Sequence, residues 1–182
     1  MDLLEFLIEI EEDPSIHSAR LLLILKEFAG ENGDKKINGL TKLVKLDFLL
    51  RYPVYLERAL LAKGLKSGCV EIKDFERRSV ESRMIRYHYG PWDHRYRAFI
   101  NILVGKGLAE IEIERNTIII GITKKGLELA EIICTKPEFQ DTIRRSQILK
   151  STFEKMGAMA LKEFIYTTFP EIVSLKKGEV IK

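Results

Sequence analysis

The chain has 182 residues, of which 46% are hydrophobic and 31% are charged, which is enough apolar material for a core without a disulfide or a structural metal. No uncharged apolar run approaches the roughly 20 residues of a membrane-spanning helix. The acidic N-terminus does not resemble a signal or transit peptide, so we expect a cytoplasmic protein with no membrane partner. Cys69 and Cys134 lack metal-ligand spacing and are predicted to be ordinary thiols.

Charge is distributed unevenly along the chain, although the formal net charge is only +3. Residues 1–17 carry six acidic side chains and no lysine or arginine, whereas residues 18–68 carry ten basic and five acidic ones. Residues 73–106 carry eight basic and four acidic side chains. This asymmetry favours an anionic partner for the body of the chain, with a solvated charged face as the alternative.

The N-terminal region is predicted to hold two helices. Residues 2–12 have the pattern of a short amphipathic helix, which Asp13-Pro14-Ser15 should end. Ser18 is then expected to cap a second helix that runs to about Phe28.

A largely buried helix is predicted for residues 39–52, because the run is rich in apolar residues. It should stop before Pro53, since the residue preceding a proline avoids the helical region. Pro53 is expected to open another helix that ends near Gly64. Residues 66–80 are polar and irregular, and indicate an insertion or a flexible connection.

A further helix is predicted for residues 93–106, with Asp93 as its cap. Its apolar residues follow the 3, 4, 3 spacing of one helix face: Tyr96, Phe99, Ile100 and Leu103. Gly105 and Gly107 should end it.

Two strands should follow this helix. Residues 108–114 alternate strictly, with Ala109, Ile111 and Ile113 on one side and three glutamates on the other, which is typical of a strand with one wet face. Arg115-Asn116 is predicted to form the turn, and residues 117–122 the returning strand. Thr123 should cap a helix in which Gly126 lets the first turn approach the hairpin closely.

From Pro137 onward two more helices are predicted, split around Gly157. Their apolar side chains could bind a partner. Burial against the rest of the chain is the interpretation that we favour.

No catalytic motif is present, so we do not expect an enzyme. The sequence contains no GxSxG motif and no phosphate-binding glycine loop, and the glutamates of residues 108–114 should face solvent. His88 and His94 lie six residues apart, but no third ligand is near in sequence, so no metal and no cofactor are predicted.

Basic and aromatic residues mark a candidate surface for DNA or a protein partner around the 93–106 helix. Arginine contacts phosphates and guanine edges, and exposed aromatic rings can stack on bases. The alternative is that the aromatic residues pack onto the core and the arginines are ordinary surface charge. The candidate residues are Arg83, Arg86, His88, Trp92, His94, Arg95, Arg97, Lys106, Lys124 and Lys125.

These elements predict a mainly α fold with a small β wing, in which a winged helix-turn-helix core carries an N-terminal helix and C-terminal helices. The expected parts are an acidic helix at 1–17, a winged-helix domain at 18–134 with an insertion around 53–80, and a helical extension at 135–182. Two tandem winged helices, the first spanning 18–72, remain an alternative.

Two motifs resemble a known family: GLTKLVKLDFLLRYP at 39–53 and YGPWDHRY at 89–96, followed by the wing after Gly107-Leu108. In this order the chain resembles the middle component, a small accessory subunit, of ABC three-component systems such as the Lamassu anti-phage systems. The resemblance covers most of residues 18–134. It implies a non-enzymatic subunit that binds an SMC-like coiled-coil ATPase and a separate effector, often a nuclease, in a complex that senses foreign DNA.

We therefore expect an accessory subunit of an SMC-like ATPase complex in bacterial anti-phage defence, which helps to assemble the complex and contacts double-stranded DNA. The alternative is a stand-alone winged-helix transcription regulator that reads the major groove with the 93–106 helix. A regulator of this kind would act as a homodimer.

Overall fold

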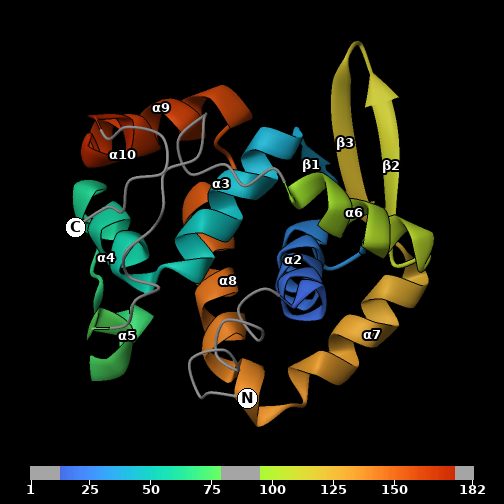
Figure 1. The fold of residues 1–182 in the computed structure, drawn as a ribbon, viewed down its shortest axis with the longest axis horizontal. Helices are drawn as coiled ribbons and strands as arrows, with labels where there is room; N and C mark the ends of the chain where they lie inside the picture. The colour runs from blue at the N-terminus through green and yellow to red at the C-terminus, as the bar shows by residue number, and fades with distance from the viewer. Residues whose placement is uncertain (1–12, 79–94, 175–182) are drawn as a thin grey trace.

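The computed structural model describes residues 13–78 and 95–174, and they form a mainly helical protein with one three-stranded antiparallel sheet (Figure 1). This confirms the predicted combination of many helices with a small β element. The longer helices are α2 (Pro14–Ala29), α3 (Leu40–Arg51), α4 (Pro53–Ala62), α6 (Tyr96–Gly105), α7 (Lys124–Cys134), α8 (Gln140–Phe153) and α9 (Ala158–Thr168). The shorter ones are η1 (Gly68–Val70), α5 (Asp74–Arg78), η3 (Pro137–Phe139) and α10 (Glu171–Ser174).

The sheet consists of β1 (Ile37–Asn38), β2 (Ala109–Glu114) and β3 (Thr117–Ile122), in the order β1-β3-β2. The β2–β3 hairpin matches the two predicted strands, and Arg115 and Asn116 form its turn with φ of 44° and 69°. Positive φ at both positions is the geometry of the two-residue turns that suit the twist of a hairpin. β1 was not predicted, because two residues are too few to show alternation.

α2 begins five residues earlier than predicted. Asp13 is its N-cap, and its side chain accepts a hydrogen bond of 2.7 Å from the Ser15 amide. Proline at the first helical position starts a helix as readily as it ends one, because its missing N–H needs no partner there. Ser18 therefore lies within the helix and is buried, so its predicted role as a cap is wrong.

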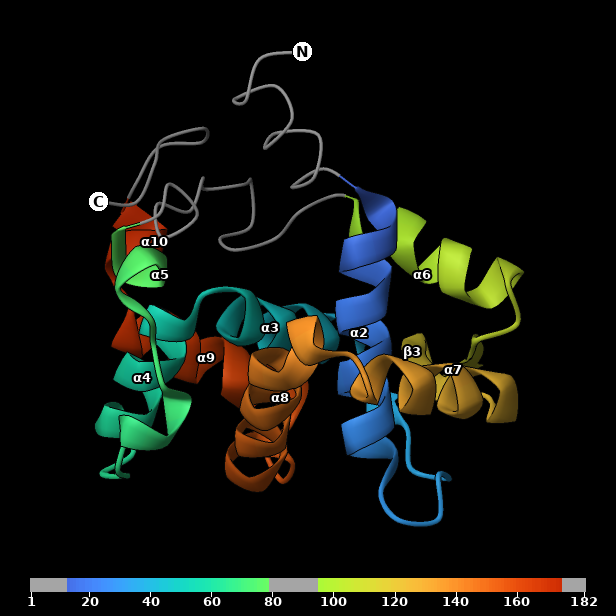
Figure 2. The same ribbon diagram turned by 90° about the horizontal axis from the view of Figure 1, so that it is seen from below.

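α2 lies in the middle of the fold. α6 and α7 are on one side of it, and α4, α5 and α10 are on the other (Figure 2). α3 ends at Arg51, before Pro53, and α4 starts at Pro53, as predicted. Both α2 and α3 are covered over much of their surface, which explains their long apolar runs.

The core is one continuous cluster that includes residues from both halves of the chain. Phe153, Leu161, Ile165 and Phe169 have 0% of their surface exposed. α8 packs against α2 and α3, and α9 packs against α3 and α4. The predicted burial of the C-terminal helices against the rest of the chain is therefore confirmed.

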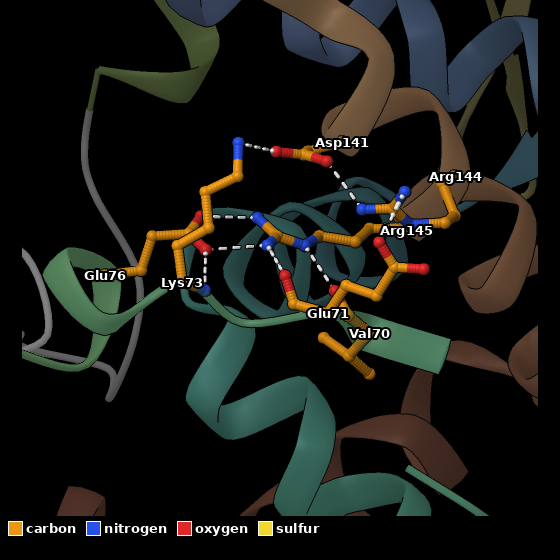
Figure 3. A network of polar contacts seen from close by, with 7 residues as sticks. All are labelled: Val70, Glu71, Lys73, Glu76, Asp141, Arg144 and Arg145. Carbon is orange, nitrogen blue, oxygen red and sulfur yellow. Dashed lines mark hydrogen bonds and ion pairs between the residues drawn. The ribbon is translucent and has the colours of Figure 1, made fainter. Parts of the chain in front are cut away.

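The segment after α4 is more ordered than its polar sequence predicted. Val70 is fully buried, and Arg145 of α8 holds the segment by four hydrogen bonds (Figure 3). The Arg145 guanidinium donates to the carbonyls of Val70 and Glu71, each at 3.1 Å, and to both carboxylate oxygens of Glu76 at 2.6 and 2.8 Å. A planar guanidinium suits this because its five donors point in fixed directions.

Candidate nucleic-acid and partner interface

α6 buries one face and presents a polar face to solvent. Its buried residues are Tyr96, Phe99, Ile100 and Leu103, as their spacing predicted. Arg97 and Asn101 are exposed and four residues apart, so they lie on the same side of the helix,. Arginine pairs with the edge of guanine and asparagine with that of adenine. This face of α6 therefore presents two side chains of the types that pair with base edges. Sequence reasoning missed Asn101, although its spacing from Arg97 was a usable signal.

The structure describes half of the predicted site residues. Arg83, Arg86, His88, Trp92 and His94 lie outside the described residues.

Arg95, Arg97, Lys106, Lys124 and Lys125 are described, and they do not form a single patch. The Arg95 guanidinium carbon lies 5.9 Å from the centre of the Phe99 ring, and the side chain is partly buried. Arg95 therefore contributes to packing as well as to surface charge.

Lys106 and Lys125 are brought together where α6, the hairpin and α7 meet. Lys125 Nζ donates to the Lys106 carbonyl at 2.9 Å. Thr123, the N-cap of α7, accepts from the Gly126 amide at 3.0 Å and donates to the Gly107 carbonyl at 2.6 Å. Its predicted capping role is confirmed. The lysines thus form a basic corner at the base of the hairpin, joined to the end of α6 by hydrogen bonds.

The basic corner and Arg97 lie at opposite ends of α6. With a rise of about 1.5 Å per residue, positions 97 and 106 are roughly 14 Å apart along the helix axis. The described cations could therefore meet two separate phosphates, but they do not concentrate charge at one point.

The β2–β3 hairpin carries the glutamates of β2 on one face and apolar side chains on the other. Lys36 Nζ lies 2.7 Å from Glu110 Oε1 and 2.5 Å from Glu112 Oε1. These carboxylates were predicted to be solvated, but they are also held in ion pairs. The hairpin projects beyond the helices, as Figure 1 shows.

The apolar face of the hairpin is only partly covered. Ile120, in the middle of β3, is fully buried, whereas Ile111 is 38% exposed and Ile113 is 74% exposed. The prediction of one dry and one wet face is therefore wrong for the outer half of β2. Alternation indicates which residues share a face, but it does not indicate how far the protein body extends beneath them.

A buried polar cluster fixes the start of α6 against α2 and α3. Arg20 Nε and Nη2 donate to the two carboxylate oxygens of Asp47 at 2.5 and 2.8 Å, and the Tyr96 hydroxyl donates to Asp47 Oδ2. His17 Nδ1 lies 3.0 Å from Arg20 Nη2, and its ring stacks on Phe99 at 4.8 Å. Sequence reasoning treated Tyr96 as an apolar position of the helix and as an aromatic residue of the candidate surface, and it did not identify Arg20 or Asp47.

Electrostatics in this cluster favour the ion pair. Burial alone would raise the pKa of Asp47, but the charge and hydrogen bonds of Arg20 outweigh it and hold that pKa below its ordinary value,. Burial and the neighbouring Asp47 both raise the pKa of Tyr96 well above its ordinary value. Tyr96 therefore stays a neutral donor, and the three helices are connected through one carboxylate.

Within residues 13–78 and 95–174, no group of three or more His, Cys, Asp or Glu side chains is placed to hold a metal ion. In the same part of the chain, no helix is both long and apolar enough to cross a bilayer.

Comparison of the chain with models of protein families, with curated proteins and with solved structures finds no match.

Proposed function

We propose that α2, β1, α3, α6 and the β2–β3 hairpin form a winged-helix unit, with α4 and α5 inserted between its second and third helices. The order helix, strand, helix, helix, hairpin supports this assignment, as does the sheet order β1-β3-β2. In such a unit α6 is the recognition helix and the hairpin is the wing. The Arg20–Asp47–Tyr96 cluster then has a clear purpose, because it fixes the recognition helix against the other two.

We further propose that the chain is a non-enzymatic accessory subunit of an SMC-like ATPase complex in anti-phage defence. The observation that carries a protein-binding role is the wing, because Ile113 is 74% exposed on a hairpin whose other face bears glutamates. A wing that follows a DNA backbone should instead carry cations. The identity of the partner rests on the resemblance of the 39–53 and 89–96 motifs to the middle component of ABC three-component systems.

DNA contact is the second part of this proposal. Arg97 and Asn101 supply one contact on α6, and the basic corner formed by Lys106 and Lys125 supplies another. Few phosphates would be neutralised by these cations, so the chain alone should bind duplex DNA weakly and with a shallow salt dependence. A stand-alone regulator, the alternative function, should bind a defined operator tightly.

Co-expression with the neighbouring genes followed by affinity purification tests the main proposal. We expect a coiled-coil ATPase to co-purify, and Ile113→Lys to reduce its recovery while leaving the circular dichroism spectrum unchanged. The matched control is Met159→Lys, which places the same charge at a residue that is 62% exposed on α9. Recovery of this chain without any ATPase would sink the proposal.

Fluorescence anisotropy with duplex DNA at 50 and 200 mM salt tests the DNA contact. We expect Arg97→Glu to weaken binding of the assembled complex about tenfold, whereas Lys155→Glu, on the exposed turn after α8, should not. Tight, sequence-specific binding by the purified chain alone would favour the transcription regulator instead.

A further inference from the structure

Within the part of the chain that the structure describes, the outer edge of β2 pairs with no other strand. In the order β1-β3-β2, β2 pairs with β3 on one side only. Among the described residues, no main-chain hydrogen bond joins residues 109–114 to any element other than β3. A row of unpaired N–H and C=O groups is a template for another strand.

The register shows which groups point outward. The Gly39 amide donates to the Ile118 carbonyl at 2.9 Å, so the main chain of Ile118 faces β1 and not its opposite residue, Ile113. In antiparallel pairs, hydrogen-bonded and non-bonded positions alternate. The Thr123 amide donates to the Leu108 carbonyl at 3.1 Å, which fits the same alternation. The N–H and C=O groups of residues 109, 111 and 113 therefore point to the open edge.

The side chains of Glu110 and Glu112 do not cover the outer edge of β2. A Cβ at Gly121 would lie 3.1 Å from both Lys36 Cγ and Glu110 Oε1. The ion pair therefore crosses over β3 and draws the carboxylates away from the outer side of β2. The strand contains no proline and no lysine, and its register has no bulge. Proline, lysine and a bulge, three of the usual protections of an edge strand, are therefore absent from β2.

We propose that β2 binds an extended segment of a partner protein by strand addition, and that this segment alternates apolar with basic residues. Its apolar side chains would lie beside Ile111 and Ile113, which are 38% and 74% exposed. Its basic side chains would lie beside Glu110, Glu112 and Glu114, of which Lys36 pairs with the first two. Against these three carboxylates stand the Lys36 ammonium and Arg115, which lines the same hollow as Glu114, so a small excess of negative charge remains on that face.

A second copy of this chain is a poorer occupant of the edge. Pairing of two β2 strands would place the two glutamate rows directly beside each other, and like charges at opposite positions destabilise a sheet. The projecting hairpin leaves space for a foreign strand, because Figure 1 shows no described helix along the outer side of β2 near its tip. The inference rests on the proposed function in one respect, the assignment of a protein partner to the hairpin.

Titration of the full chain with three labelled peptides tests the strand addition. The first peptide alternates isoleucine and lysine, the second has the same composition with the two residue types in separate blocks, and the third replaces lysine with glutamate. We expect the first peptide to bind at least about tenfold more tightly than the others, because only it matches both the pleat and the charge.

Hydrogen exchange measured by NMR distinguishes strand addition from simple apolar contact. In the free chain the amides of the exposed residues 111 and 113 should exchange fast and those of 110, 112 and 114 slowly. The alternating peptide should slow the first set. Ile113→Pro should abolish binding, since it removes an outward N–H without breaking the pairing with β3. The matched control, Ile113→Thr, keeps that N–H and should still bind.

The inference is overturned if all three peptides bind equally or if the alternating peptide does not bind. It is also overturned if amide exchange at positions 111 and 113 is unchanged in the wild-type complex. A dimer of the free chain that Ile111→Lys abolishes would overturn it as well. If Ile113→Pro unfolds the hairpin, the exchange experiment on the wild-type chain still decides. If the peptide and exchange experiments show no strand addition but an ATPase co-purifies, only the strand-addition inference is rejected. If strand addition is observed but no ATPase co-purifies, only the accessory role is rejected.

Discussion

Lys45 shows the cost of a buried cation in this protein. Only 1% of its surface is exposed, and Nζ lies 3.5 Å from the Tyr166 hydroxyl and 4.9 Å from the centre of that ring. No carboxylate of the described residues pairs with it. Burial, helped by the charge of Lys162, lowers the pKa of Lys45 to about 7,. The charged form of Lys45 therefore destabilises the fold.

We predict that Lys45→Met stabilises the protein at pH 6, and that its advantage shrinks as the pH rises. Between pH 7 and 10.5 the unfolded chain holds the Lys45 proton more tightly than the folded chain does. The stability of the wild type should therefore rise in that window by up to about 4 kcal/mol more than that of the variant. Urea denaturation of both proteins from pH 6 to 10 measures the difference, and a difference that does not change with pH would contradict the prediction.

Asp47 is the opposite case, a buried charge that is fully paired. We predict that Asp47→Asn costs about 3–5 kcal/mol of unfolding free energy at pH 7, because it leaves Arg20 buried without its counter-ion. The pKa of Asp47 is lowered on folding, so its contribution is present above the ordinary value of 3.8 and is lost as the pH falls through the folded value,. The difference between wild type and variant should therefore shrink on acidification.

Tyr96→Phe is the control for this prediction. It removes one hydrogen bond to a charged group and leaves the ion pair intact, so it should cost only about 1.5–3 kcal/mol. Guanidinium denaturation at pH 7 and at pH 3 compares the three proteins. A smaller loss for Asp47→Asn than for Tyr96→Phe would show that the pair is not the main interaction.

At the scale of elements, local sequence signals predicted where helices and turns begin and end. Long-range contacts determined how the elements pair and which of their faces are buried. Pro53, the Arg115-Asn116 turn and the Thr123 cap each act on their own neighbours, so the sequence is sufficient to place them. The Arg20–Asp47–Tyr96 cluster joins residues 27 and 49 positions apart, and no local pattern indicates such a pairing. For the same reason the alternation in residues 108–114 predicts which residues of β2 share a face, but it does not predict how much of each face the rest of the protein covers.

The junction of the hairpin with α7 depends on Gly126. A Cβ at this position would lie 2.0 Å from the main-chain oxygen of Leu108 and 2.8 Å from Ile122 Cγ1. The predicted close approach is therefore confirmed. Because the nearest atom belongs to the backbone, the contact cannot be relieved by a side-chain rotation.

We predict that Gly126→Ala destabilises the protein by about 2–4 kcal/mol, since α7 or the hairpin must shift to relieve the overlap. Gly105→Ala is the matched control. Gly105 lies at the end of α6 with nothing within 4 Å of the added Cβ, and alanine should stabilise that helix by about 0.5–1 kcal/mol. Thermal unfolding of both variants gives the comparison. Equal effects of the two substitutions would show that the contact with Leu108 is not limiting.

At the scale of the whole molecule, the C-terminal helices belong to the same core as α2 and α3. Phe153 has 0% of its surface exposed and lies in the one cluster that also contains Leu21 and Phe48. Its ring centre is 5.7 Å from that of Phe164 in α9. Loss of packing at Phe153 should therefore be transmitted to helices at the start of the chain.

We predict that Phe153→Ala costs about 3–5 kcal/mol and that the protein still unfolds in one cooperative transition. The slowest-exchanging amides of α2 and α3 should then exchange faster by the same factor as those of α8, because all of them exchange through global unfolding. Met159→Ala, at a side chain that is 62% exposed in α9, should leave these rates nearly unchanged. Faster exchange confined to α8 and α9 would mean that the C-terminal helices unfold separately, and the shared core would then not make the chain a single folding unit.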